Sequence, residues 1–183
     1  MYLYPMIEMN KKEIYLLIGQ KGSGKSFVGK IFNDEFNVKF IRVEDWVRQI
    51  RKDQDVFSET YLKQVFETIE KGIREALLEI DRLVFESTGL SSYFDKMLEG
   101  LKKDFHVTTI GIYADSKICL NQVRARDKTI HINISDDQVS LINEKVKARN
   151  LLTDFRIDNE TKTEKELIRE IRTILETVKI NRI

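Results

Sequence analysis

Residues 14–32 read IYLLIGQKGSGKSFVGKIF. Within them, GQKGSGKS at residues 19–26 has the G-x-x-x-x-G-K-[S/T] spacing of a phosphate-binding loop, or P-loop. The apolar run 14–18 precedes this loop as a buried strand would, and residues 27–32 follow it with apolar side chains at helical spacing. Because the motif requires a strand before it and a helix after it, we expect residues 19–26 to bind nucleotide phosphates. The alternative is a glycine-rich turn that binds nothing.

The chemistry of the loop assigns roles to its residues. We expect Gly19, Gly22 and Gly24 to adopt positive φ, so that backbone N–H groups donate to phosphate oxygens at a helix N-terminus. Lys25 would reach the β- and γ-phosphates, and the Ser26 hydroxyl would complete a magnesium shell. The predicted ligand is ATP or GTP with Mg²⁺, ATP being the leading choice. The predicted nucleotide contacts in the loop are Gly19, Gln20, Lys21, Gly22, Ser23, Gly24, Lys25, Ser26 and Phe27.

Composition and charge argue against other classes of protein. The chain has 183 residues, 42% of them hydrophobic and only one a proline, which predicts a single globular domain over residues 1–183. A formal net charge of +1 argues against a long nucleic acid or an anionic membrane as partner. The single cysteine, Cys119, cannot form an internal disulfide, so we expect a cytoplasmic protein. The first 19 residues resemble neither a signal peptide nor a membrane span.

Apolar runs and amphipathic stretches alternate along the rest of the chain. Strands are predicted at 14–18, 38–43, 82–85, 107–113 and 155–157. A long amphipathic helix is predicted over 58–80, with a possible bend at Gly72, and a last helix begins at a capping box of Thr163 and Glu166. Buried strands alternating with helices indicate a three-layer α/β domain with a parallel sheet.

Four further segments lie where predicted strands end or the next helices begin: IRVEDWVR (41–48), LVFESTG (83–89), ICLNQVRARD (118–127) and FRIDN (155–159). Together with the P-loop they resemble, over nearly the whole chain, the small P-loop kinases related to adenylate kinase and shikimate kinase. The resemblance implies a five-stranded parallel sheet in the order 2-3-1-4-5. It also implies an acceptor-binding insert at about 45–80 and a lid at about 127–143.

On the acceptor side, the resemblance places Asp45 and Arg48 against the substrate. A carboxylate just past a strand beside the P-loop can accept a hydroxyl proton, and either Asp45 or Glu44 could do so. Asp45 as a simple helix cap is the alternative. Val43 stands where shikimate kinases have a second aspartate, which weakens the expectation of a magnesium role here.

The third predicted strand ends in a carboxylate and a hydroxyl beside the P-loop. We predict Glu86 as a second magnesium ligand, and Glu86, Thr88 and Gly89 as acceptor contacts. The alternative assigns Glu86 and Thr88 to a turn and a cap. Adenylate kinases have an arginine soon after this strand and shikimate kinases a run of glycines, so the predicted acceptor is neither AMP nor shikimate.

The lid and the last loop supply the remaining candidates. Arg126 matches the second of two lid arginines in the family and would neutralise the transferring phosphoryl group, with Arg124 close by. A solvated basic helix face is the alternative for both. Arg149 could reach phosphates from the far side of the lid. Asn159 is expected near the nucleotide base, although turn residues alone give the same pattern.

The leading hypothesis is therefore an ATP-dependent kinase of a nucleotide or small hydroxylated metabolite, with Lys25, Asp45 and Arg126 as catalytic residues. One alternative is a regulatory or scaffolding ATPase with a protein partner, in which Glu86 orders water. The other is a kinase of polynucleotide 5′ ends, against which the near-neutral charge argues.

Overall fold

The computed structural model describes residues 11–50, 58–125 and 135–181. The strands in these ranges are β1 (Glu13–Ile18), β2 (Lys39–Phe40), β3 (Arg82–Ser87), β4 (His106–Tyr113) and β5 (Phe155–Asp158). The helices are α1 (Lys25–Phe36), α2 (Val43–Val47), α3 (Glu59–Glu79), α4 (Ser92–Asp104), α5 (Ser116–Arg124), α6 (Asp136–Arg149) and α7 (Glu164–Ile180).

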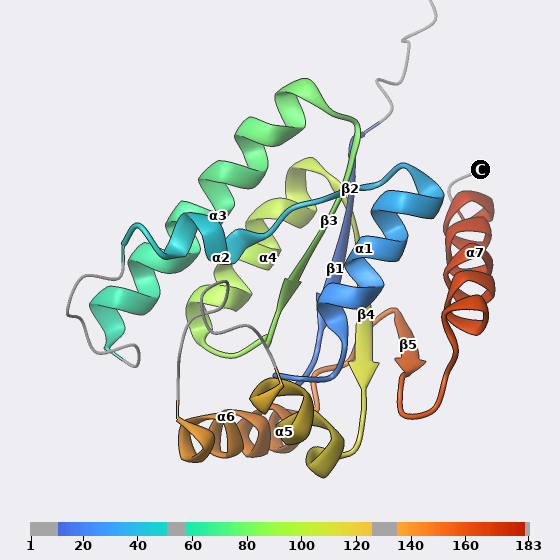
Figure 1. The fold of residues 1–183 in the computed structure, drawn as a ribbon. Helices are drawn as coiled ribbons and strands as arrows, with labels where there is room; N and C mark the ends of the chain where they lie inside the picture. The colour runs from blue at the N-terminus through green and yellow to red at the C-terminus, as the bar shows by residue number, and fades with distance from the viewer. Residues whose placement is uncertain (1–10, 51–57, 126–134, 182–183) are drawn as a thin grey trace, which may run out of the picture.

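The strands form one parallel sheet in the order β2-β3-β1-β4-β5, which confirms the predicted order. β1 lies at the centre, with Leu16 opposite Phe85 of β3 and Thr109 of β4. The carboxyl ends of the strands point toward α5 and α6, which lie across that edge of the sheet (Figure 1). Because β1 continues directly into the P-loop, the loop sits in the middle of this edge, where parallel α/β sheets bind ligands.

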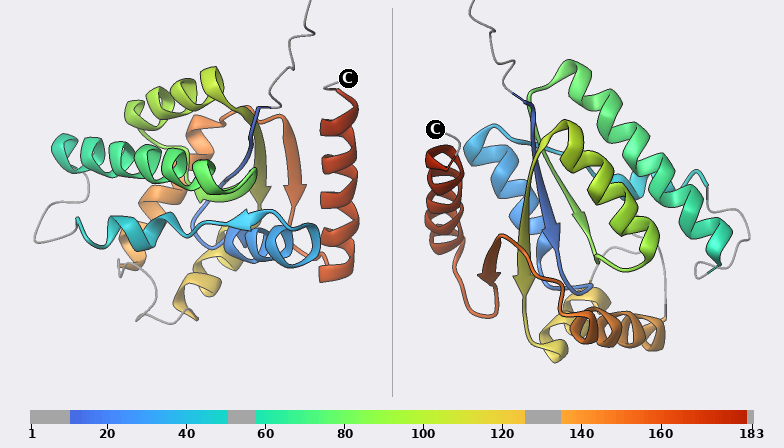
Figure 2. Two further views of the ribbon diagram at one scale, coloured as in Figure 1. Left: turned by 90° about the horizontal axis from the view of Figure 1, so that it is seen from above. Right: turned by 180° about the vertical axis from the view of Figure 1, so that it is seen from behind.

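Successive side chains of β1 enter two separate cores, as expected of a strand buried on both faces. Ile14, Leu16 and Ile18 pack with residues of α2, α3 and α4, whereas Tyr15 and Leu17 pack with residues of α1 and α7. The views from above and behind show these helix groups on opposite faces of the sheet (Figure 2). The predicted three-layer architecture is confirmed.

Helix starts follow their capping signals. The hydroxyl of Ser58 accepts from the N–H of Tyr61 at the start of α3, and Thr163 and Glu166 form the predicted capping box of α7. A second capping box, Ser135 with Gln138, begins α6. Residues 135–143, predicted as part of the lid, are therefore the N-cap and first turns of a helix. The rest of the predicted lid, 127–134, lies outside the described residues.

Two local features differ from the sequence prediction. The run 38–43 was predicted as a strand, but β2 covers two residues and Val43 begins α2. The N–H of Ile41 still donates to the Val84 carbonyl, but the N–H of Asp45 donates to Arg42, which closes a helical turn.

Gly72 marks no interruption, since α3 is one helix over Glu59–Glu79. A Cβ at this position would lie 2.6 Å from Cζ3 of Trp46. The glycine therefore admits the indole ring against the helix backbone. Among the described residues, no helix is long and apolar enough to cross a membrane.

Candidate nucleotide and acceptor site

The P-loop needs its glycines for two different reasons. Gly22 and Gly24 adopt positive φ, 86° and 92°, as predicted. Gly19 does not, and this part of the prediction is wrong. Glycine is required at residue 19 because the loop lies close to β4 there: a Cβ would be 2.2 Å from the carbonyl oxygen of Ile112. A side chain at residue 19 would push the loop away from the sheet.

Lys25 lies inside the loop rather than reaching into solvent. Its side chain belongs to a residue only 6% exposed. Nζ donates to the carbonyl oxygens of Gly19 at 2.9 Å and Gln20 at 2.7 Å. These bonds hold the ammonium group at the place where the loop residues converge, and three donors allow it to serve a phosphate group from there.

The start of α1 has the properties of an anion site. Gly24 is its N-cap, and within the described chain no side chain caps this terminus. The first-turn N–H groups of a helix have no intrahelical acceptors and carry the positive end of the helix dipole. The Ser23 hydroxyl beside them is fully buried and makes no hydrogen bond among the described residues. A bound phosphate group would satisfy these donors, so the loop fits the predicted nucleotide.

The two predicted magnesium ligands lie together. The Ser26 hydroxyl donates to Oε1 of Glu86 at 2.7 Å. Parallel pairing sets Glu86 opposite Leu17 on the neighbouring strand, which brings its carboxylate to the P-loop. Hydroxyl and carboxylate oxygens suit Mg²⁺, which keeps several water and phosphate ligands. The described residues contain no group of three or more His, Cys, Asp or Glu that could hold a metal.

Two asparagines hold the loop from outside. Asn143 of α6, 6% exposed, accepts from the N–H of Lys21 at 2.7 Å and donates to the Lys21 carbonyl at 3.0 Å. The amide of Asn159 donates to the Ser23 carbonyl at 3.0 Å. The side-chain donor of Asn159, expected near the nucleotide base, is thus engaged with the loop itself.

Asn143 was missed in the sequence because its partner lies 122 positions away. The available signal was a polar residue on an otherwise apolar helical stripe, four residues after Val139.

Asp45 lies within α2, and Arg48 is the C-cap of that helix. The N-cap of α2 is Arg42, so the alternative that Asp45 caps this helix is wrong. Asp45 is exposed and its carboxylate is available to a ligand. Nη2 of Arg48 is buried and has no hydrogen-bond partner among the described residues. A buried guanidinium nitrogen without an acceptor is costly, which marks it as a place for an anionic group.

The segment after β3 is joined to α6 through Arg149. Gly89 has φ 71°, and its carbonyl accepts from Nη1 of Arg149. Nη2 of Arg149 pairs with Asp95, and its guanidinium lies over the Phe94 ring. The N-cap of α4 is Ser91, so neither Glu86 nor Thr88 caps that helix. Arg149 thus fixes the turn that holds the predicted acceptor contacts.

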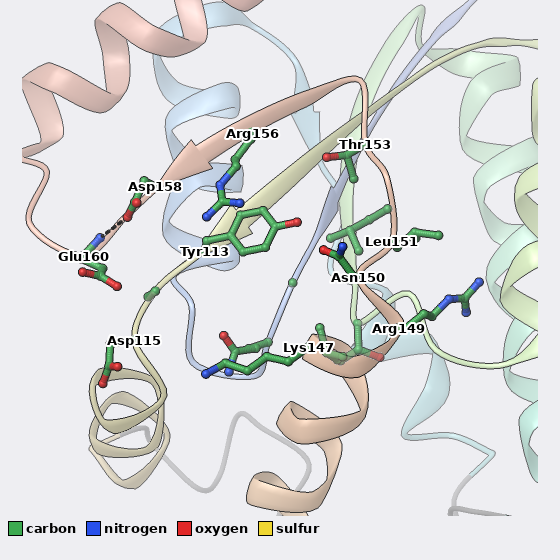
Figure 3. A pocket seen from close by; sticks show the side chains of 16 residues that line it. Tyr113, Asp115, Lys147, Arg149, Asn150, Leu151, Thr153, Arg156, Asp158 and Glu160 are labelled. Carbon is green, nitrogen blue, oxygen red and sulfur yellow. Dashed lines mark hydrogen bonds between the residues drawn. The ribbon is translucent and has the colours of Figure 1, made fainter.

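A pocket of about 240 Å³ adjoins the P-loop on the side facing α6 (Figure 3). The Gly19 and Gln20 segment forms one wall. The guanidinium of Arg156 lies 3.7 Å from the centre of the Tyr113 ring, and the side chain of Arg149 points away from that ring. Asp115, another lining residue, caps α5, and the N–H of Lys117 lowers its pKa below the ordinary value.

Of the two arginines considered for the lid, the structure describes only Arg124. Arg124, at the end of α5, forms an ion pair with Asp136 at 2.9 Å, which connects the two helices that flank residues 126–134. Arg126 lies outside the described residues, and its catalytic role stays a prediction.

A parallel sheet in this order, a P-loop between its central strand and α1, and a hydroxyl–carboxylate pair beside the loop define a P-loop phosphotransferase. The family model described as shikimate kinase matches residues 21–177. The chain therefore belongs to the shikimate kinase family, and it is an ATP-dependent kinase of small metabolites. This confirms the resemblance inferred from the sequence.

Individual relatives agree with this assignment. A shikimate kinase from Sulfurihydrogenibium sp. (strain YO3AOP1) is 26% identical over 165 residues, which are 88% of this chain and 96% of that protein. The crystal structure of shikimate kinase from Aquifex aeolicus VF5 has a TM-score of 0.60 at 24% identity and covers 92% of this chain and 98% of that one. A gluconokinase from Sinorhizobium meliloti 1021 has a TM-score of 0.60 at 18% identity, with 94% and 98% covered. The two structures show the fold alone.

Proposed function

We propose that this kinase transfers the γ-phosphoryl group of magnesium-ATP to a hydroxyl group of a small metabolite that also carries an anionic group. The observation that supports the anionic group is Nη2 of Arg48, buried and without a partner among the described residues. The names of two relatives, a shikimate kinase and a gluconokinase, point to hydroxylated acids as acceptors of related enzymes. Where shikimate kinases have a run of glycines, this chain has Gly89, Leu90 and Ser91, which favours an acceptor other than shikimate.

On the nucleotide side, the hydrogen-bond donors are already in place. Backbone N–H groups of the P-loop bind the β- and γ-phosphates, and Nζ of Lys25 exchanges its two carbonyl acceptors for phosphate oxygens. Ser26 and Glu86 would hold Mg²⁺ directly or through its water ligands. The bound ion supplies charge neutralisation on the transferring phosphoryl group.

On the acceptor side, Asp45 accepts the proton of the attacking hydroxyl, with Glu44 as the other candidate on the same turn. Arg48 binds the anionic group, and Thr88 and Gly89 contact the rest of the acceptor. Residues 45–80 then form the acceptor-binding insert. Arg126 would neutralise the transferring group. We also propose a cytoplasmic location, since the single cysteine, Cys119, is a free buried thiol.

The test is thermal unfolding with magnesium-ATP in the presence of shikimate, gluconate, other hydroxylated acids, neutral polyols and nucleoside monophosphates. An acceptor that raises Tm beyond the effect of ATP is then assayed for ADP release. We expect a hydroxylated acid to do both, because ligands that bind only the folded state stabilise it. Lys25→Ala should abolish the shift caused by ATP. ADP release that no acceptor stimulates would instead favour a regulatory ATPase.

A matched pair of variants tests the acceptor site. Arg48→Gln should raise the acceptor KM by on the order of tenfold or more and leave the ATP KM near its original value, since a charged hydrogen bond is lost. Lys63→Gln removes a cation from the exposed face of α3 and should change neither constant. An Arg48→Gln enzyme with an unchanged acceptor KM would contradict the proposed anionic contact.

A further inference from the structure

We propose that Asn143 and Asn159 are positioning residues that set the orientation of the P-loop peptides. Their amides turn the N–H groups of Gly22 and Gly24 toward the nucleotide phosphates. The inference rests on the proposed nucleotide binding by residues 19–26. It goes further because it assigns nucleotide affinity to two residues outside the loop motif, on α6 and after β5.

The peptide between Gln20 and Lys21 is held at both ends. Its carbonyl oxygen accepts from Nζ of Lys25 at 2.7 Å, and its N–H donates to Oδ1 of Asn143 at 2.7 Å. In a trans peptide the C=O and N–H bonds point in opposite directions. Asn143 and the Lys25 ammonium therefore lie on opposite sides of the loop, with Lys25 on the phosphate side.

The next peptide, between Lys21 and Gly22, is turned the other way. Its carbonyl accepts from Nδ2 of Asn143 at 3.0 Å. The N–H of Gly22 must then point away from Asn143, toward the side where the Lys25 ammonium lies. Asn143 thus pairs with both backbone groups of Lys21 as a neighbouring strand would, and this pairing presents the Gly22 donor to a phosphate oxygen.

Asn159 does the same one step further along. Its Nδ2 donates to the Ser23 carbonyl at 3.0 Å, so the N–H of Gly24 points away from Asn159. The backbone N–H of Asn159 donates to the Tyr113 carbonyl at 2.8 Å, which anchors the residue to the end of β4. A Cβ at Gly24 would lie 2.1 Å from Nδ2 of Asn159, so the amide is packed directly under the loop.

Together the contacts produce a concave set of N–H donors, which is the geometry of an anion-binding nest. Pre-oriented donors bind more tightly than donors that must be ordered on binding, because the ordering cost is already met. Loss of either amide should therefore weaken phosphate binding without affecting the acceptor. If the two asparagines only supported the fold, their substitution would lower Tm and leave the phosphate affinity of the folded protein unchanged.

The experiment compares Asn143→Leu, which keeps the side-chain size and removes both hydrogen bonds, with Asn159→Ala in a half-exposed loop. Calorimetric titration gives Kd for magnesium-ATP and for inorganic tripolyphosphate, and kinetics give KM for ATP and for the acceptor. We expect both Kd values to rise together by on the order of tenfold per variant, which corresponds to about 1.4 kcal/mol. The acceptor KM should stay near the original value.

Three controls make the outcome decisive. Val139→Ala removes a buried α6 side chain and should lower Tm without changing either Kd, and Glu144→Gln changes an exposed α6 residue and should alter nothing. Lys25→Ala should lose ATP and tripolyphosphate binding. If Lys25→Ala loses binding while both asparagine variants bind the ligands as the original protein does, the positioning role is overturned and the proposed function stands. If the unaltered protein binds neither ligand, the proposed function itself fails, and the positioning role with it.

Discussion

Trp46 is the only tryptophan of the chain, and it packs on the backbone of α3 at Gly72. Three of its ring carbons would lie within 2.7 Å of a Cβ at that position. A rigid indole cannot give way as the end of a flexible side chain can. The contact joins α2, which contains Asp45 and is followed by Arg48, to the long helix of the proposed acceptor insert.

Gly72→Ala should destabilise the protein by about 1–2 kcal/mol, because overpacking against the indole outweighs a gain of about 1 kcal/mol in helix propensity. Trp46 fluorescence should shift at the same time. The control is Gly100→Ala on α4, whose nearest contact is the carboxylate end of Glu70 at 3.0 Å, a flexible group. Urea unfolding of both variants is the measurement, and a stabilised Gly72→Ala protein would contradict the packing account.

Among single residues, the sequence predicted best the positions of those that local spacing determines. The motif placed Lys25 and Ser26 correctly at the start of α1, and the end of β3 brought Glu86 to Ser26 as expected. Asn143 was missed and Arg149 was only loosely placed, because their contacts depend on how α6 returns to the sheet. No local pattern encodes that path.

Among the elements, α5 depends on an exposed charged cap. The carboxylate of Asp115 accepts from the N–H of Lys117, and the N–H groups of the first turn lower the pKa of Asp115 below its ordinary 3.8. A depressed folded-state pKa means that the ionised cap stabilises α5 fully above the unfolded-state pKa. This stabilisation is lost as the pH falls through the folded-state pKa.

Asp115→Asn should keep the cap, since asparagine caps helices as well as aspartate, and should remove its titration. We therefore expect the variant to lose less stability than the original protein as the pH falls below about 4. Thermal unfolding across pH 2–7 measures the difference, and carbon NMR of the Asp115 carboxylate gives its midpoint directly. A midpoint at or above 3.8 would refute the assigned cause.

Element boundaries were predictable where capping residues marked them, as at Ser58 and Thr163. The prediction of boundaries failed at β2. The apolar run 38–43 suggested a strand of six residues, but the strand has only two residues and Val43 already begins α2. Apolar residues serve a buried strand and a short helix on the core equally well, so the run could not distinguish them.

At the scale of the whole molecule, one sheet separates two apolar cores within the part of the chain that the structure describes, and neighbouring residues of β1 contribute to different ones. Leu16 and Leu17 are both fully buried, and they share no core cluster. The sheet backbone, by contrast, belongs to both. We expect the described layers to unfold as one cooperative unit, so that a substitution that destabilises either core lowers the stability of both.

Leu16→Ala and Leu17→Ala should each cost about 2–5 kcal/mol, the usual range for a buried leucine. Each should lower Tm by roughly 5–15 °C in a protein of this size. Trp46 packs against the core that contains Leu16, whereas Leu17 belongs to the other core. The decisive variant is therefore Leu17→Ala, for which the unfolding transition followed by Trp46 fluorescence should shift as far as the transition followed by circular dichroism. A fluorescence transition that stays in place would show that the two cores unfold separately.

The architecture was the most predictable part of the chain, because alternation of buried strands and helices permits few arrangements once right-handed crossovers are required. The order 2-3-1-4-5 came from the family resemblance rather than from the periodicity, and the structure confirms it. The acceptor could not be predicted in the same way, since its proposed contacts come from α2 and from the segment after β3 together.

The edges of this sheet are its shortest strands. β2 has two residues and β5 has four, whereas the three inner strands have six to eight. An exposed edge strand is a template on which a second chain can add by backbone pairing, and short edges offer few groups for it. The strands richest in apolar residues are thus kept from intermolecular contact, so aggregation of this protein should require prior unfolding rather than edge-to-edge growth of the native sheet.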